Sequence, residues 1–262
     1  MRNFFLVLLI VALGCANAQE RLFFAERPYE SLTTDIQGNL YLSVGSNLDF
    51  FTPDGNRHLN YSNPTWGNIT RVDASIASKI LVFYRESGVI TLLDNELSPI
   101  NGPLSLFDKS LMTVSLAAMG NPNKIVLYDE ANQDLIITDL SLNVLSQTHI
   151  TFPDEFHPTD MQVVPEHRIA LLDTLRGICL FDFFGTYDKM IPIPNVQAMQ
   201  FKKECIFYLK DNTLYKYTLP TAYLPMSINS LDIILPKIKQ FHLFQNTLYY
   251  IDERNIPFKK GL

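Results

Sequence analysis

The strongest constraint on the fold is a short strand-like string that recurs six times in the 262-residue sequence. Each copy is rich in Leu, Ile, Val and Tyr, and its first aliphatic residue serves as an anchor. The anchors are Leu40, Ile80, Ile125, Ile169, Ile206 and Leu248. Their spacings of 40, 45, 44, 37 and 42 residues are typical of the blades of a β-propeller.

The segments around each anchor agree with this repeat. A further strand-like segment begins eight to ten residues after each anchor, and another precedes it, as in 31–34 and 238–241. Asn, Gly and Asp lie between these segments, for example in 210–212, and they suit tight hairpins. We therefore predict an all-β fold with few helices: a six-bladed β-propeller of four-stranded antiparallel blades.

The two ends of the sequence predict how the ring closes. The sixth unit stops at Leu262, soon after its third strand, and so lacks an outermost strand. Residues 21–25 form a spare strand-like segment before the first unit. We expect this N-terminal strand to complete the last blade, which leaves no long sheet edge open.

The first residues have the pattern of an export signal. Arg2 is followed by an apolar run over 4–14, too short to span a bilayer, and then by the small-residue site Ala16-Asn17-Ala18. We expect a signal peptide at 1–18, a single propeller domain at 19–262, and a periplasmic or secreted protein. As an alternative, residues 12–15 resemble a lipobox, and acylated Cys15 would then anchor an outer-membrane lipoprotein. No membrane attachment is expected other than this anchor.

Composition narrows the classes of partner. The formal net charge is −6 and no basic run is present, which argues against nucleic acid. Cys179 and Cys205 lie in predicted strands, either as buried thiols or as one bridge between neighbouring blades. Asn60 and Asn68 stand in glycosylation sequons, which matter only in a host that uses them.

Several units resemble the blades of the NHL and lactonase-like (SMP-30-like) propellers of secreted and periplasmic proteins. The matching strings are 35–41, 127–132, 171–178 and 250–255, in which a hydrophobic strand leads into an Asp and a turn. The resemblance spans nearly the whole mature chain and implies the architecture. It implies little about activity, because propellers carry many unrelated functions.

In several units a charged residue stands at nearly the same place, close to the end of the strand that contains the anchor. Asp129, Asp173 and Asp252 each lie four residues after an anchor, and Arg85 lies five after its own. Together they could ring the channel mouth and bind a cation or a polar ligand. Alternatively, each carboxylate accepts N–H bonds within its own turn.

Two further places are candidates for binding. His157 and Asp160 fall in the loop that enters a predicted channel-lining strand, where propeller ligands usually bind. Trp66 lies in a polar loop, where it is either an exposed partner contact or a side chain tucked between blades.

The sequence contains no motif of a common catalytic or phosphate-binding site. No histidine has a metal-ligand spacing with another ligand residue, so no metal and no cofactor is expected. The leading hypothesis is a non-catalytic propeller that binds a protein partner or a ligand in the cell envelope or extracellular space. The alternative is a metal-dependent hydrolase of the lactonase type, with its site at the central channel.

Overall fold

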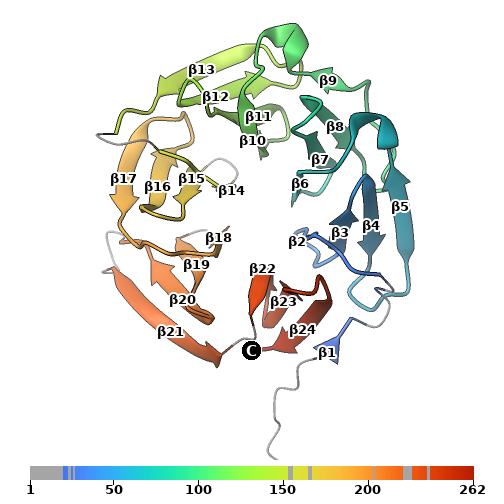
Figure 1. Ribbon diagram of the computed structural model, residues 1–262, viewed down its shortest axis with the longest axis vertical. Helices are drawn as coiled ribbons and strands as arrows, with labels where there is room; N and C mark the ends of the chain where they lie inside the picture. The colour runs from blue at the N-terminus through green and yellow to red at the C-terminus, as the bar shows by residue number, and fades with distance from the viewer. Residues whose placement is uncertain are drawn as a thin grey trace, which may run out of the picture.

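The computed structural model describes residues 20–22, 25, 27–152, 156–164, 167–202, 204–220, 226–234 and 237–262. The predicted signal peptide and Cys15 lie outside these residues. Six four-stranded antiparallel sheets are arranged in a ring around a central axis (Figure 1). The prediction of a six-bladed β-propeller is confirmed.

The blades are numbered in chain order, with strands given from the channel to the rim. Blade 1 contains β2 (Ser31–Thr34), β3 (Leu40–Val44), β4 (Asn47–Phe51) and β5 (His58–Ser62). Blade 2 contains β6 (Arg71–Ile76), β7 (Lys79–Tyr84), β8 (Val89–Leu93) and β9 (Leu104–Ser105). Blade 3 contains β10 (Val114–Asn121), β11 (Lys124–Asp129), β12 (Asp134–Asp139) and β13 (Val144–His149).

The second half of the chain repeats this order. Blade 4 contains β14 (Asp160–Val164), β15 (Arg168–Asp173), β16 (Gly177–Asp182) and β17 (Tyr187–Ile191). Blade 5 contains β18 (Ala198–Lys202), β19 (Cys205–Lys210), β20 (Thr213–Thr218) and β21 (Ser227–Ile234). Blade 6 contains β22 (Ile238–Phe244), β23 (Thr247–Asp252), β24 (Pro257–Gly261) and β1 (Glu20–Arg21). Two short 3-10 helices, η1 (Pro64–Trp66) and η2 (Phe107–Lys109), lie in the loops after β5 and β9.

Every anchor predicted from the sequence lies in the second strand of a blade. The turns use the predicted residue types, as between β19 and β20, where Asp211 and Asn212 have φ of 50° and 58°. Two consecutive positive φ values match the right-handed twist of a tight hairpin. Within the described residues, no helix is long and apolar enough to cross a bilayer.

An N-terminal strand completes the last blade as predicted, but it is Glu20–Arg21 and not the expected segment 21–25, of which residues 23 and 24 lie outside the described residues. Glu20 and Arg21 pair with Lys259 and Phe258 of β24, and the Leu22 N–H donates to the Pro257 carbonyl at 3.1 Å. The Leu22 side chain is 1% exposed, in a cluster formed by blades 6 and 1. The spare segment therefore supplies both strand pairing and buried apolar area to the closure.

A buried carboxylate holds the segment that follows this closure. Asp49 of β4 accepts hydrogen bonds from Arg27, from Tyr29 at 2.7 Å, and from His58 and Asn60 at 2.9 Å each. Burial alone would raise the pKa of Asp49, but these bonds outweigh it and the pKa is lowered. Asp49 thus ties the chain between β1 and β2 to blade 1.

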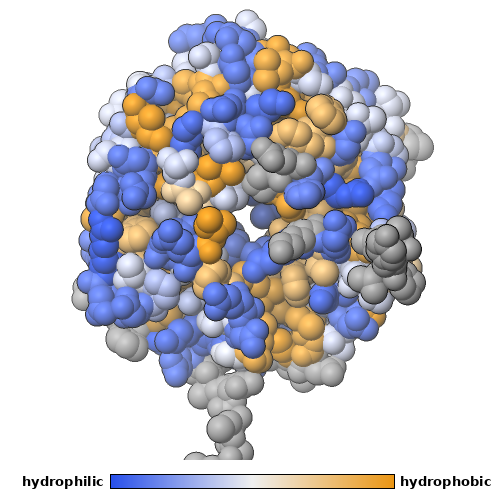
Figure 2. Space-filling model, turned by 180° about the vertical axis from the view of Figure 1, so that it is seen from behind, coloured by the Kyte–Doolittle hydropathy of each residue, from blue (hydrophilic) through white to orange (hydrophobic). Residues whose placement is uncertain are grey.

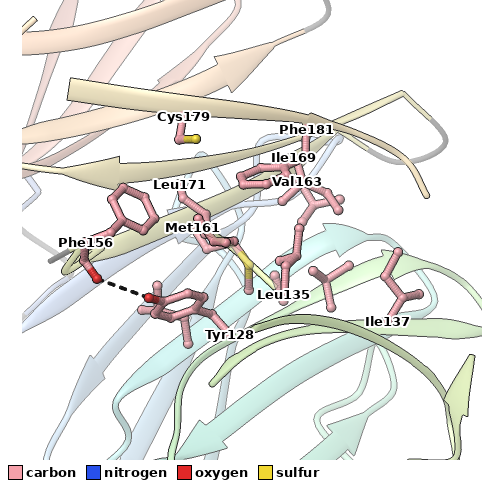
Figure 3. Close-up of a cluster of buried hydrophobic side chains, with 14 residues drawn as sticks. Tyr128, Leu135, Ile137, Phe156, Met161, Val163, Ile169, Leu171, Cys179 and Phe181 are labelled. Atoms are coloured by element: carbon pink, nitrogen blue, oxygen red, sulfur yellow. Dashed lines mark hydrogen bonds between the residues drawn. The ribbon is translucent and has the colours of Figure 1, made fainter. Parts of the chain in front are cut away.

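The core lies between the faces of neighbouring blades. Figure 3 shows the junction of blades 3 and 4, where Tyr128, Leu135 and Ile137 meet Ile169 and Phe181. The Tyr128 hydroxyl donates to the Phe156 carbonyl at 3.2 Å, which satisfies a polar group inside this apolar layer (Figure 3). Cys179 is a buried free thiol in the same layer, and burial raises its pKa to about 12. Cys205 is likewise free.

The strand order defines two faces of the ring. The linker face carries the loops between blades and the turns between second and third strands. The opposite face carries the turns between first and second and between third and fourth strands. Each inner strand therefore starts at the linker face and runs to the opposite face.

Candidate functional site

The carboxylates predicted to ring the channel mouth lie on the linker face, at the ends of β11, β15 and β23. Asp129 accepts from the Thr113 hydroxyl at 2.5 Å and from the Asn132 backbone and side chain. Burial raises the pKa of Asp129, yet the bonds from Thr113 and Asn132 bring it below its usual value. A carboxylate held in this way fastens the loop that enters β10 to the adjacent turn.

Asp173 and Asp252 make comparable contacts. Asp173 accepts from the N–H groups of His157, Leu175 and Arg176 at 2.8 to 3.2 Å. Asp252 accepts from the N–H groups of Arg254 and Ile256 at 2.9 Å each. The bonds from Leu175, Arg176, Arg254 and Ile256 are those expected by the second interpretation, in which each Asp organises its own turn. The bond from His157 instead joins Asp173 to the loop that enters β14.

The structure brings two other predicted residues together through a third. Arg85 donates to Glu130 at 2.6 Å, and Nδ1 of His157 lies 3.9 Å from the same carboxylate. The three side chains thus span blades 2, 3 and 4 on the linker face. Glu130 was not predicted, although it stands directly after Asp129 in the sequence.

Trp66 lies elsewhere, in η1 between blades 1 and 2. It is partly buried and packs against the core cluster of these blades, as Leu59 and Tyr61 also do. This position matches the expectation of a side chain tucked between blades.

Asp160 is the predicted residue that reaches the channel itself. At the start of β14, it pairs with Arg71 from the start of β6, and Arg71 also donates to the Met161 carbonyl. Burial lowers the pKa of Arg71, but the charges of Asp160 and Asp73 outweigh it and raise the pKa. The pair joins blades 2 and 4 across the linker-face end of the channel.

Polar side chains of the inner strands also join neighbouring blades. Asp73 accepts from the Met119 N–H at 2.8 Å, joining blade 2 to blade 3. Gln200 accepts from the Leu243 N–H at 2.7 Å, and Gln240 from the Leu32 N–H at 2.9 Å. In each case a side chain accepts from a backbone N–H group of an inner strand. That N–H group lies on the channel side of the strand, where no further strand of the described residues pairs with it.

His242 of β22 lies at the centre of a second polar group, nearer the opposite face. Its Nδ1 is 2.6 Å from the Thr34 hydroxyl, and its Nε2 is 3.0 Å from Nε2 of Gln200. Burial, together with the charges of Lys202 and Arg71, lowers the pKa of His242 to about 3. The imidazole is therefore neutral at neutral pH.

Sequence reasoning missed most of this channel lining, although a signal was present. Polar residues alternate with apolar ones along the inner strands, as in Arg71-Val72-Asp73 and Gln200-Phe201-Lys202. Such alternation marks two different faces of a strand. Figure 2 shows the opening at the centre of the ring, with hydrophilic residues on part of its border.

A surface cavity of about 460 Å³ lies on the opposite face at blades 4 and 5. Its lining residues are His167, Arg168, Asp182, Thr186, Tyr187, Asp188 and Glu204. Arg168 pairs with Asp188, which leaves the charges of Asp182 and Glu204 uncompensated within this set. Among the described residues, no three His, Cys, Asp or Glu side chains are grouped so that they could hold a metal ion.

Fold and channel together define the class of protein as a six-bladed β-propeller. No protein-family model and no curated protein matches the sequence. Virginiamycin B lyase from Staphylococcus aureus is similar in structure, with a TM-score of 0.63 at 10% identity over 94% of this chain and 98% of that chain. The WD40 domain of Pan2 from Neurospora crassa has a TM-score of 0.62 at 11% identity over 89% of each chain.

A third similar structure is BBS1N, solved in complex with ARL6DN. It has a TM-score of 0.56 at 14% identity, over 90% of this chain and 77% of that chain. At these identities the likeness establishes a shared propeller fold, and no activity follows from it.

Proposed function

We propose that this propeller is a non-catalytic docking platform for a partner protein, and that its contact surface lies at the junction of blades 3 and 4. The observation that carries the proposal is a group of exposed apolar side chains on this junction. Phe184, in the turn between β16 and β17, is 69% exposed, and Val144 and Leu145 of β13 are 49% and 54% exposed. We call Val144, Leu145, Phe184 and Tyr187 the blade 3–4 surface.

Contacts between the two blades hold this surface together. The Ser146 hydroxyl of β13 donates to the Phe184 carbonyl at 3.2 Å. Tyr187 packs edge-on against Phe152 and Phe181, with ring centroids 5.9 Å apart in each case. Large apolar side chains presented on a rigid support are typical of sites that bind proteins.

The cavity on the opposite face indicates the chemistry of the partner. Tyr187 belongs both to the blade 3–4 surface and to the cavity lining, so the two adjoin. Because Asp182 and Glu204 lack basic partners within that lining, a basic side chain from the partner would be favoured there. We expect a partner segment that carries a Lys or Arg beside apolar residues.

The fold of similar proteins supports a docking role. BBS1N was solved in complex with ARL6DN, and another similar propeller belongs to the mitotic checkpoint complex, at a TM-score of 0.62 and 12% identity. The resemblance of several blades to NHL-like propellers of secreted proteins supports a place outside the cytoplasm. Mass spectrometry of the mature N-terminus tests this, since export predicts Gln19 or acylated Cys15 as the first residue, and retained Met1 contradicts it.

Single substitutions on the two faces of blade 4 test the docking surface. Phe184→Ser should remove most of the partner recovered by affinity capture from the native source, because it deletes the largest exposed apolar contact. Leu175→Ser is the matched control, since Leu175 is 78% exposed in the same blade but on the linker face. Equal recovery with Phe184→Ser and wild type would contradict the proposed surface.

A further inference from the structure

The channel end nearer the opposite face contains several hydrogen-bonding side chains: Thr34, Gln200, Lys202 and His242. Gln200 fixes the arrangement, because its Oε1 accepts from the Leu243 N–H and its Nε2 must therefore donate. Nε2 of Gln200 lies 3.0 Å from Nε2 and 3.1 Å from Nδ1 of His242, and Nδ1 also lies 2.6 Å from the Thr34 hydroxyl. In the tautomer with the proton on Nδ1, the imidazole donates to the Thr34 hydroxyl, whose own hydrogen then needs another acceptor.

Lys202 adds a positive charge to the same region. It lies at the end of β18, its Nζ donates to the Leu243 carbonyl, and no carboxylate of the described residues pairs with it. Two N–H donors of its ammonium group remain. Burial lowers the pKa of Lys202, as expected for a cation that has no anionic partner.

Arg71, at the linker-face end of the channel, has a further donor without a partner in the described part of the chain. Its Nε is buried and has no hydrogen-bond partner among the described residues, while its terminal nitrogens bind Asp160 and the Met161 carbonyl. The charges of Arg71 and Lys202 both lower the pKa of His242. Asp160 and Asp73 compensate Arg71, whereas the charge of Lys202 remains uncompensated.

We propose that the central channel binds a small oxyanion, of the size of inorganic phosphate, between Lys202 of β18 and Thr34 of β2. An oxyanion accepts several hydrogen bonds, and its negative charge would provide the partner that Lys202 lacks. The neutral His242 positions the Thr34 hydroxyl for this contact. The site is separate from the blade 3–4 surface, so either proposal can fail without the other.

Titration calorimetry with inorganic phosphate tests the site on the purified protein. The wild type should bind one phosphate per chain at submillimolar concentration, and Lys202→Met should weaken this binding at least tenfold. Lys109→Met, which makes the same change at an exposed residue of η2, should bind as the wild type does. Sodium chloride at matched ionic strength controls for general salt effects.

A second variant keeps the test valid if Lys202→Met fails to fold. Thr34→Val removes the hydroxyl donor with little change of volume, and it should weaken phosphate binding several-fold while the circular dichroism spectrum stays that of the wild type. Absence of saturable binding by the wild type would overturn the proposal. Equal affinity of the wild type and the Lys202→Met or Thr34→Val variant would do the same.

Discussion

At the scale of single residues, aspartates at strand ends repeatedly organise the turns that follow them. Asp94, Asp139 and Asp182 end third strands or directly follow them, and each accepts N–H bonds from the residues two and four positions later. The residue four positions later is Ser98, Asn143 or Thr186. This spacing is visible in the sequence, so the turn role of Asp could be predicted from local chemistry.

The long-range contacts of the channel could not be predicted in this way. Arg71 and Asp160 are 89 residues apart in the sequence and belong to blades 2 and 4. Only the closed ring brings them together. The sequence repeat predicts the number of blades, but it does not show which side chains meet across the channel. Both His157 and Asp160 were expected in the loop that enters an inner strand: His157 lies in that loop, and Asp160 is the first residue of β14. Their partners Glu130 and Arg71 were missed.

The buried imidazole of His242 predicts a pH-dependent stability. Its pKa is about 3 in the folded state and about 6.5 when unfolded. Between these values the unfolded chain binds more protons, so the stability is fully present above pH 6.5 and falls as the pH is lowered. The contribution of His242 to the slope approaches about 1.4 kcal/mol per pH unit.

Urea unfolding at several pH values between 4 and 7.5 measures this slope. His242→Gln should lower the slope relative to the wild type, since glutamine hydrogen-bonds but does not titrate. The other histidines contribute equally to both proteins. Parallel pH profiles for the two proteins would show that His242 does not titrate with a lowered pKa.

At the scale of elements, the second and third strands of each blade could be predicted because they are continuous apolar segments at a regular spacing. The outer strands lack this signal. β13 is mostly exposed, and β9 contains only two residues. Exposure to solvent at the rim relaxes the requirement for apolar residues, so the hydrophobic pattern weakens there.

The closing strand offers a direct test at this scale. Leu22→Ala should destabilise the protein by about 3 kcal/mol, because it opens a cavity in the cluster between blades 6 and 1. Arg21→Ala, on the exposed strand next to it, should change stability by about 0.5 kcal/mol or less. The free energy of unfolding in urea measures both effects, and similar values for the two variants would argue against the buried closure.

At the scale of the whole molecule, the ring separates two kinds of binding surface. The channel is lined by polar side chains that link blades, and the blade 3–4 surface presents apolar side chains at the rim and on the opposite face. Both depend on closure, because closure fixes each blade against its two neighbours. The account therefore rests on the pairing of β1 with β24.

Engineered cysteines at Glu20 and Lys259 measure that pairing most directly. These residues are paired across β1 and β24, and their side chains form an ion pair at 3.2 Å, so both point to the same side of the blade. Paired antiparallel residues have Cα separations of about 4.5–5.5 Å, within the range of a disulfide. With Cys15 and Cys205 replaced by serine, mild oxidation should give an intramolecular disulfide and a higher melting temperature that reduction reverses. Free thiols at both positions after oxidation, with an unchanged melting temperature, would contradict the closed ring.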